Sequence, residues 1–172
     1  MAILSLGQAT QYPDQYDPSL LFPIPRAENR AKLGFKDSQA LPFVGVDIWN
    51  AFELSWLNKK GKPQIALAEF QIPADSPNMI ESKSFKLYLN SLNSTHFADE
   101  HQLRELLIKD LSIVAGSKIT TRIQATEAVA KKGMQEMSGV LLDRLDIEVD
   151  PNLPADPNLL DRKSTRLNSS HT

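Results

Sequence analysis

Residues 80–93 read IESKSFKLYLNSLN, and this stretch decides the fold of the region around it. In a helix, successive side chains rotate by about 100°, so the apolar residues of the stretch share one face. They are Phe85, Tyr88, Leu89 and Leu92. Glu81 lies on the same face, one turn before Phe85, whereas Lys83 and Lys86 point the opposite way. The stretch therefore predicts a helix from about residue 78 to about residue 93 that packs through its apolar face.

The position of Glu81 has two interpretations. An unpaired carboxylate on a buried face is costly, so Glu81 needs a hydrogen-bonding or charged partner. It lies near the start of the predicted helix, where a negative charge interacts favourably with the helix dipole. Alternatively, the carboxylate lies at the mouth of a pocket and accepts N–H groups of a ligand. The spacing alone leaves both interpretations open.

A hairpin is predicted before this helix. Residues 47–57 alternate in the manner of a strand. Glu53 and Ser55 are expected on one side of this strand, and the other side is expected to carry Ile48, Phe52, Leu54 and Trp56. Residues 58–63 are polar and contain a glycine, as a hairpin loop requires. Residues 65–72 supply the returning strand.

A second helix follows the first. Asp99 and Gln102 resemble a capping box, and Gly116 can end the helix. The apolar stripe between them consists of Leu103, Leu106, Leu107, Leu111 and Val114. Residues 119–125 and 141–149 then alternate as strands. The order ββααββ predicts an α+β fold in which antiparallel strands carry two helices on one face.

The chain divides by composition into a central module and flanking segments. Residues 1–46 contain five prolines, which favour an extended arm with turns rather than a helical unit. We expect the module to occupy residues 47–150 and a connection to another module to begin at 151–160. Residues 161–172 have no apolar period and resemble translated sequencing-adapter DNA, so we expect a disordered tail there.

Bulk composition excludes several classes of protein. The 172 residues suit one domain or module, and a formal charge of −2 gives no reason to expect nucleic acid or an anionic membrane as partner. No stretch has the roughly 20 apolar residues of a membrane span, and the first residues do not read as a signal peptide, so a cytoplasmic location is expected. The sequence has no cysteine, which excludes disulfides and thiolate zinc sites.

The octapeptide ESKSFKLY at residues 81–88 resembles the signature of the NADPH-dependent 7-cyano-7-deazaguanine reductases, the nitrile reductases of queuosine biosynthesis. Further blocks, in the family's order, resemble the amino-terminal half of its long, two-module form: residues 6–8, 16–18, 20–26, 29–30, 42–43, 47–49, 53–58, 60–64 and 143–150. Together they cover about residues 6–160. The resemblance implies the tunnelling fold, in which modules associate edge to edge into barrels.

The resemblance also implies a reaction and its binding residues. The family reduces a nitrile to a primary amine with hydrides from two NADPH molecules. The resemblance assigns Ile80, Glu81 and Ser82 to the deazaguanine substrate, and Ser82 and Lys83 to NADPH. A carboxylate can accept adjacent N–H donors of a guanine-like edge, and a lysine near a helix N-terminus suits a phosphate. The resemblance further implies that the full-length form is a homodimer. It implies no direct contact with nucleic acid and no association with a membrane.

The missing cysteine limits what this chain can do. The family attacks the nitrile carbon with a cysteine, and in the long form that cysteine, a proton-donating aspartate and a His-Glu pair belong to the carboxy-terminal module. The resemblance therefore implies an inactive amino-terminal fragment with no catalytic residue and no metal. One alternative is a non-catalytic tunnelling-fold module for binding or assembly. Another is a pterin or GTP enzyme of the same fold, for which the supply of zinc ligands is too poor, since His96 and His101 are not spaced for one helical face.

Overall fold

The computed structural model describes residues 13–35, residues 41–127 and isolated positions between 141 and 154. The chain divides into two units, residues 1–134 and 135–172, and the helices and strands below belong to the first. The predicted strand over 141–149, the connection at 151–160 and the tail at 161–172 fall wholly or mainly outside the described residues. The predictions for those segments stay predictions.

A four-stranded sheet in the order β5-β2-β3-β6 forms one layer of this unit. Strands β2 (Val46–Asn58) and β3 (Pro63–Pro73) form an antiparallel hairpin, and β6 (Thr120–Ala125) pairs antiparallel with β3. The short β5 (His96–Phe97) pairs in parallel with the end of β2. In the hairpin loop, Asn58 Oδ1 accepts bonds from the backbone N–H groups of Lys60 and Lys62. The predicted hairpin is confirmed.

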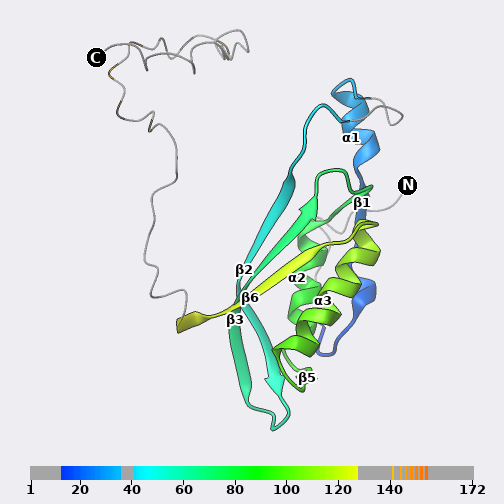
Figure 1. Ribbon diagram of the computed structural model, residues 1–172, viewed down its shortest axis with the longest axis vertical. Coiled ribbons are helices and arrows are strands. Elements are labelled where there is room, and N and C mark those ends of the chain that lie inside the picture. Colours follow the sequence, from blue (N-terminus) through cyan, green and yellow to red (C-terminus); the bar gives the residue numbers. More distant parts are fainter. Residues whose placement is uncertain are drawn as a thin grey trace. The chain divides into compact units, whose positions relative to one another are not determined.

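Helices α2 (Ser82–Ser91) and α3 (Glu100–Ala115) cover one face of this sheet (Figure 1). Asp99 Oδ1 caps α3 by accepting the Gln102 N–H at 2.9 Å, and Gly116 ends the helix with φ +67°. The buried core between sheet and helices consists of Leu54, Trp56, Ala66, Ala68, Phe70, Ile72, Phe85, Tyr88, Leu92, Leu103, Leu107, Leu111 and Ala115. The α+β class, with antiparallel strands and helices on one face, is confirmed.

A β-bulge in β2 corrects the predicted faces of this strand. Ala51 pairs with Ala68, but the next pair is Leu54 with Ala66, so two residues of β2 stand opposite one of β3. Before the bulge, Trp49 and Ala51 pack against the core, and after it Leu54 and Trp56 are buried. Ile48 and Phe52, which strict alternation places with Leu54, are 56% and 74% exposed.

The amino-terminal segment joins the same core. It contains a 3-10 turn η1 (Pro18–Leu20), strand β1 (Pro23–Pro25), which pairs antiparallel with β4 (Asn78–Ile80), and helix α1 (Arg26–Lys32). The prediction of an extended arm without a helix is wrong at α1. The sequence from 26 to 32 has no proline and is rich in good helix formers, so a helix can start once Pro25 is passed.

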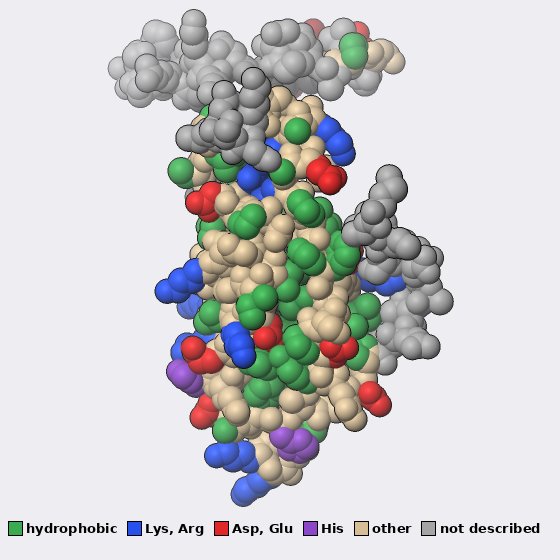
Figure 2. Space-filling view, turned by 90° about the vertical axis from the view of Figure 1, so that its right-hand side faces the viewer, with side chains coloured by type: hydrophobic (Ala, Val, Ile, Leu, Met, Phe, Trp, Pro, Cys, Tyr) green, Lys and Arg blue, Asp and Glu red, His purple; other side chains and the backbone are tan. Residues whose placement is uncertain are grey.

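The buried Arg26 ties this segment to the ends of the sheet. Its Nε donates to Ser76 Oγ at 3.1 Å, its guanidinium pairs with Asp47, and its backbone N–H donates to the Pro77 carbonyl. A buried cation needs such a partner set, because an unpaired charge is costly away from water. On the side of the molecule seen in Figure 2, hydrophobic side chains gather towards the middle, and basic and acidic side chains are scattered around them. Within the described ranges, no helix is both long enough and apolar enough for a membrane crossing.

Candidate functional site

The junction between β4 and α2 brings the predicted site residues together. Ile80 is the last residue of β4 and its side chain is 2% exposed. Glu81 follows with extended backbone angles, φ −67° and ψ 132°, and Ser82 is the first helical residue. The helix therefore begins later than the predicted residue 78. Residues 78–80 pair with β1 instead, so a partner distant in sequence determines their structure.

The carboxylate of Glu81 caps α2. Oε1 accepts the backbone N–H of Lys83 at 2.9 Å, and Oε2 accepts that of Ser84 at 2.6 Å. The first N–H groups of a helix have no partner within it, and the positive end of the helix dipole favours a negative charge there. Glu81 is 6% exposed. These contacts favour the first interpretation of Glu81, in which its carboxylate stabilises the amino-terminal end of the helix. Glu81 is the residue just before the first turn, rather than part of that turn.

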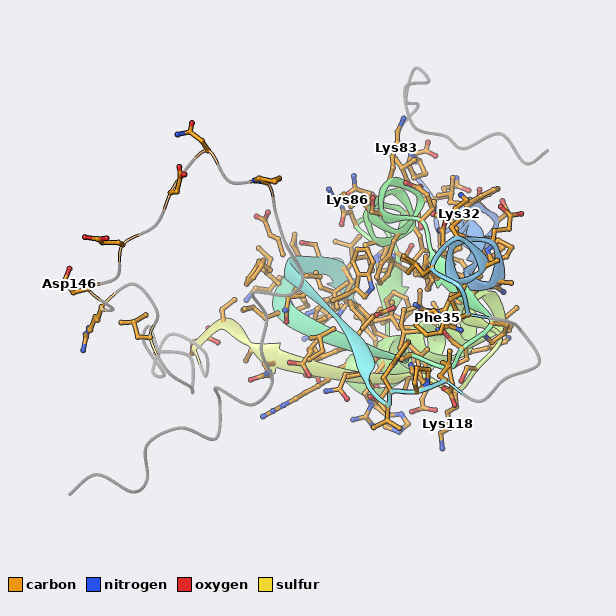
Figure 3. The ribbon with its side chains drawn as sticks, turned by 90° about the horizontal axis from the view of Figure 1, so that it is seen from above. Lys32, Phe35, Lys83, Lys86, Lys118 and Asp146 are labelled. Carbon is orange, nitrogen blue, oxygen red and sulfur yellow. The ribbon has the colours of Figure 1, made fainter. Side chains whose placement is uncertain are left out.

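Ser82 and Lys83 occupy the more accessible side of this junction. Ser82 is exposed and Lys83 is half-buried. Figure 3 shows that the side chains of Lys83 and Lys86 extend outward from α2, on the side of the unit opposite Lys118. Ile80 differs from these two residues, because its side chain lies in the core. Only its main chain can contact a ligand.

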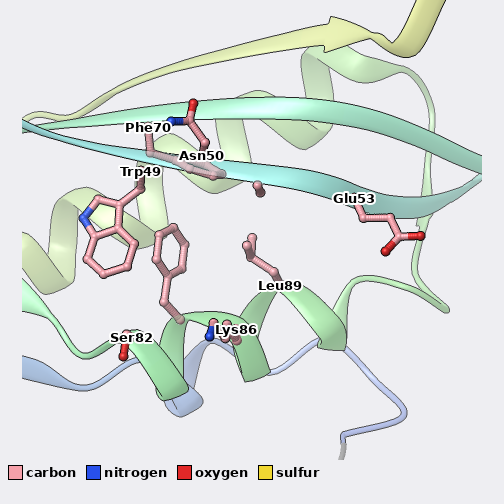
Figure 4. A pocket seen from close by; sticks show the side chains of 9 residues that line it. Trp49, Asn50, Glu53, Phe70, Ser82, Lys86 and Leu89 are labelled. Carbon is pink, nitrogen blue, oxygen red and sulfur yellow. The ribbon is translucent and has the colours of Figure 1, made fainter. Parts of the chain in front are cut away.

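A cavity of about 390 Å³ opens beside Ser82, between α2 and strands β2 and β3 (Figure 4). Its lining comprises Trp49, Asn50, Ala51 and Glu53 of β2, Phe70 of β3, and Ser82, Phe85, Lys86 and Leu89 of α2. Cavities of this size commonly hold small ligands.

Three aromatic rings give the cavity an apolar wall. The Phe85 ring packs edge-on against Trp49 at 5.7 Å between centroids and against Phe70 at 5.1 Å. Such edge-to-face pairs fix the orientation of the rings. Ser82, Asn50, Glu53 and Lys86 also contribute to the lining, but Figure 4 shows the oxygen atoms of Ser82, Asn50 and Glu53 pointing away from the rings. The aromatic wall itself suits the face of a flat ring.

The sequence did not identify the lining residues of β2 or Lys86 as part of a site. Strict alternation places Trp49 away from Leu54, and the bulge returns it to the side of α2. The one available signal was Trp49 itself, a large aromatic residue that strict alternation places on the same side as Glu53 and Ser55. Lys86 was predicted to point into solvent, and it is indeed exposed, but at the rim of the cavity.

A second polar cluster lies away from the cavity lining, around the buried carboxylate of Asp110 on α3. Its Oδ2 accepts the hydroxyls of Tyr16 and Tyr88, both at 2.7 Å. Burial first, and then the hydrogen bond to Asp110, raise the pKa of both tyrosines above the ordinary value. Both phenols therefore remain protonated donors at neutral pH. In the described ranges, no group of three or more metal-ligating side chains gathers into a metal site.

Comparison with known proteins confirms the resemblance. A family model described as nitrile reductase, 7-cyano-7-deazaguanine-reductase N-term, matches residues 12–123. Proteins named NADPH-dependent 7-cyano-7-deazaguanine reductase are 56% identical in Cupriavidus necator, 53% in Bordetella pertussis and 52% in Ralstonia nicotianae, each over 155 residues. Each match covers 90% of this chain and 56% of the relative, so the chain spans little more than half the length of these relatives.

Proposed function

Because this chain belongs to the nitrile reductase family of the 7-cyano-7-deazaguanine reductases, we propose that it is the substrate- and cofactor-binding part of such an enzyme. The enzyme converts 7-cyano-7-deazaguanine to 7-aminomethyl-7-deazaguanine on the route to queuosine, a modified nucleoside of tRNA. The observation that carries the proposal is the position of the signature. Residues 80–83 form the junction of β4 and α2, with Ser82 lining a cavity of about 390 Å³.

The substrate contacts follow from the exposure of each residue. Ser82 lines the cavity, where the aromatic wall suits a flat heterocycle. Ile80 contributes through its main chain and by filling the core beneath the junction. Glu81 has two oxygens, each with more than one acceptor direction, so an oxygen that caps α2 can also accept an N–H of the substrate.

The cofactor contacts use the same helix end. NADPH, when bound, supplies hydride. Ser82 and Lys83 offer a hydroxyl and an ammonium group to its phosphates at the positive end of α2. Since the N–H groups of Lys83 and Ser84 bond to Glu81, a phosphate is held here by side chains rather than by the helix backbone.

The covalent step of the family lies outside this sequence. Reduction of a nitrile to an amine takes two hydrides, and the family forms a thioimide with a cysteine, a residue that the sequence does not contain. We therefore expect the chain to bind the two ligands and not to turn them over. A non-catalytic binding or assembly module is the alternative, and it predicts no affinity for either ligand.

Titration calorimetry of the purified chain with 7-cyano-7-deazaguanine and with NADPH tests the proposal. Lys83→Ala should weaken NADPH binding roughly tenfold to hundredfold, because a charge-assisted contact contributes on the order of 1.5–3 kcal/mol. Lys118→Ala is the matched control, since it removes the same charge from an exposed position on the opposite side of the unit (Figure 3). Equal effects of the two variants, or no binding by the unmutated chain, would contradict the proposal.

A further inference from the structure

Two buried serines of α2 hold the amino-terminal segment against this helix. Ser84 and Ser91 are 2% and 0% exposed. They are seven residues apart, about two helical turns, so they lie on the same face of α2. A serine hydroxyl both donates and accepts, and each of these hydroxyls does both.

The two serines make matching pairs of bonds. Ser84 Oγ donates to the Glu81 carbonyl at 2.8 Å and accepts the backbone N–H of Phe22 at 3.1 Å. Ser91 Oγ donates to the Tyr88 carbonyl at 2.6 Å and accepts the backbone N–H of Asp17 at 3.2 Å. The segment between Asp17 and Phe22 is therefore fastened to α2 at both ends.

The bond at Ser84 belongs to a closed loop of contacts around Glu81. The Phe22 carbonyl accepts the Glu81 N–H at 2.9 Å, while the Phe22 N–H reaches Ser84. Ser84 in turn contacts both ends of Glu81, through its N–H to the carboxylate and through its hydroxyl to the carbonyl. The main chain of Phe22 and the side chain of Ser84 together fix the position of Glu81.

We propose that Ser84 is a positioning residue, which uses the docked segment 17–22 to hold Glu81, Ser82 and Lys83 in their binding geometry. This inference rests on the proposed function for its effect on ligands, but its structural part stands independently. Without the Ser84 hydroxyl, the Phe22 N–H loses its acceptor and Glu81 loses one tie to the segment. Ser91 makes the same kinds of bond seven residues after Ser84, away from the signature.

The test compares Ser84→Ala with Ser91→Ala, which removes an equivalent pair of bonds. Amide hydrogen exchange, resolved by NMR, is read at Lys83 and Ser84, whose N–H groups bond to Glu81. Loss of about 1.4 kcal/mol of local stability corresponds to roughly tenfold faster exchange. We expect that change in Ser84→Ala and less than about threefold in Ser91→Ala. We also expect a fivefold to tenfold weaker affinity for NADPH in Ser84→Ala alone.

Ser84→Thr separates the hydroxyl from the volume of the side chain, and it serves if Ser84→Ala does not fold. It keeps the oxygen and adds a methyl group, so exchange at Lys83 should return to within about threefold of the unmutated chain. Equal exchange in the two alanine variants, or faster exchange in Ser84→Thr than in Ser84→Ala, overturns the inference. Absent NADPH binding by the unmutated chain refutes the proposed function instead, and the exchange measurements still decide the role of Ser84.

Discussion

Replacing Glu81 by glutamine tests how the signature junction is held together. Glutamine keeps the size of the side chain but exchanges one carboxylate oxygen for an NH₂ group. In the structure both oxygens accept backbone N–H groups, at 2.9 and 2.6 Å, and the side chain is buried. The substitution therefore removes the charge and turns a donor toward an N–H of Lys83 or Ser84.

The expected cost follows from these contacts. A hydrogen bond to a charged group contributes about 1.5–3 kcal/mol, and the N–H that loses its acceptor is buried. We expect the free energy of unfolding to fall by that amount, with the melting temperature lower by roughly 5–10 °C. A charge that interacts with the helix dipole alone contributes about 0.3–1 kcal/mol. The predicted loss in Glu81→Gln is clearly larger.

Glu100→Gln provides the matched control, because Glu100 is an exposed acidic residue in the first turn of α3. Urea unfolding followed by circular dichroism gives both free energies. If Glu81→Gln costs no more than Glu100→Gln, the capping role assigned to Glu81 is refuted. Calorimetry on the same proteins adds the ligand: a direct contact between Glu81 and the deazaguanine predicts roughly tenfold to hundredfold weaker binding in Glu81→Gln.

Three further predictions concern the rest of the fold and the reaction. Gly116→Ala should cost more free energy of unfolding than Gly61→Ala in urea titrations, because both have positive φ but a Cβ at Gly116 would lie 2.6 Å from Pro77 Cγ; equal costs would contradict this. Burial and the bond to Asp110 raise the pKa of Tyr88, so above about pH 10, where the unfolded tyrosine ionises and the folded one does not, stability should fall by about 1.4 kcal/mol per pH unit from this residue. Tyr88→Phe should reduce that slope in pH-dependent unfolding, and an unchanged slope would refute the assignment. Finally, the purified chain should not oxidise NADPH in the presence of 7-cyano-7-deazaguanine, and steady turnover would show that no cysteine is needed.

Local chemistry made α3 and the hairpin predictable from sequence. Asp99 and Gly116 bound α3 as their capping chemistry requires, and Asn58 organises the hairpin loop. The same reasoning failed where pairing with a segment distant in sequence determines the secondary structure. Residues 78–80 were expected to begin the helix, yet they form a strand because β1 pairs with them.

The cavity could not be predicted, because it depends on one irregular step in β2. Period-two alternation assumes that each residue has one partner across the sheet, and the bulge between Ala51 and Leu54 breaks that assumption. Trp49 changes sides as a result and forms the wall against Phe85. The family signature assigns residues 80–83 to a binding site, and the structure shows only that they form the junction of β4 and α2, so their binding role stays a prediction.

The docking of the amino-terminal segment also determines when, during synthesis, this segment can form its contacts. Tyr16 bonds to Asp110, 94 residues later, and Asp17 and Phe22 bond to serines 74 and 62 residues away. At ribosomal rates of about 5–20 residues per second, Tyr16 waits roughly 5–20 s before Asp110 is made. During that interval Leu21 and Tyr16 have no core to enter. The segment from Tyr16 to Phe22 therefore cannot complete its contacts until Asp110 has been made.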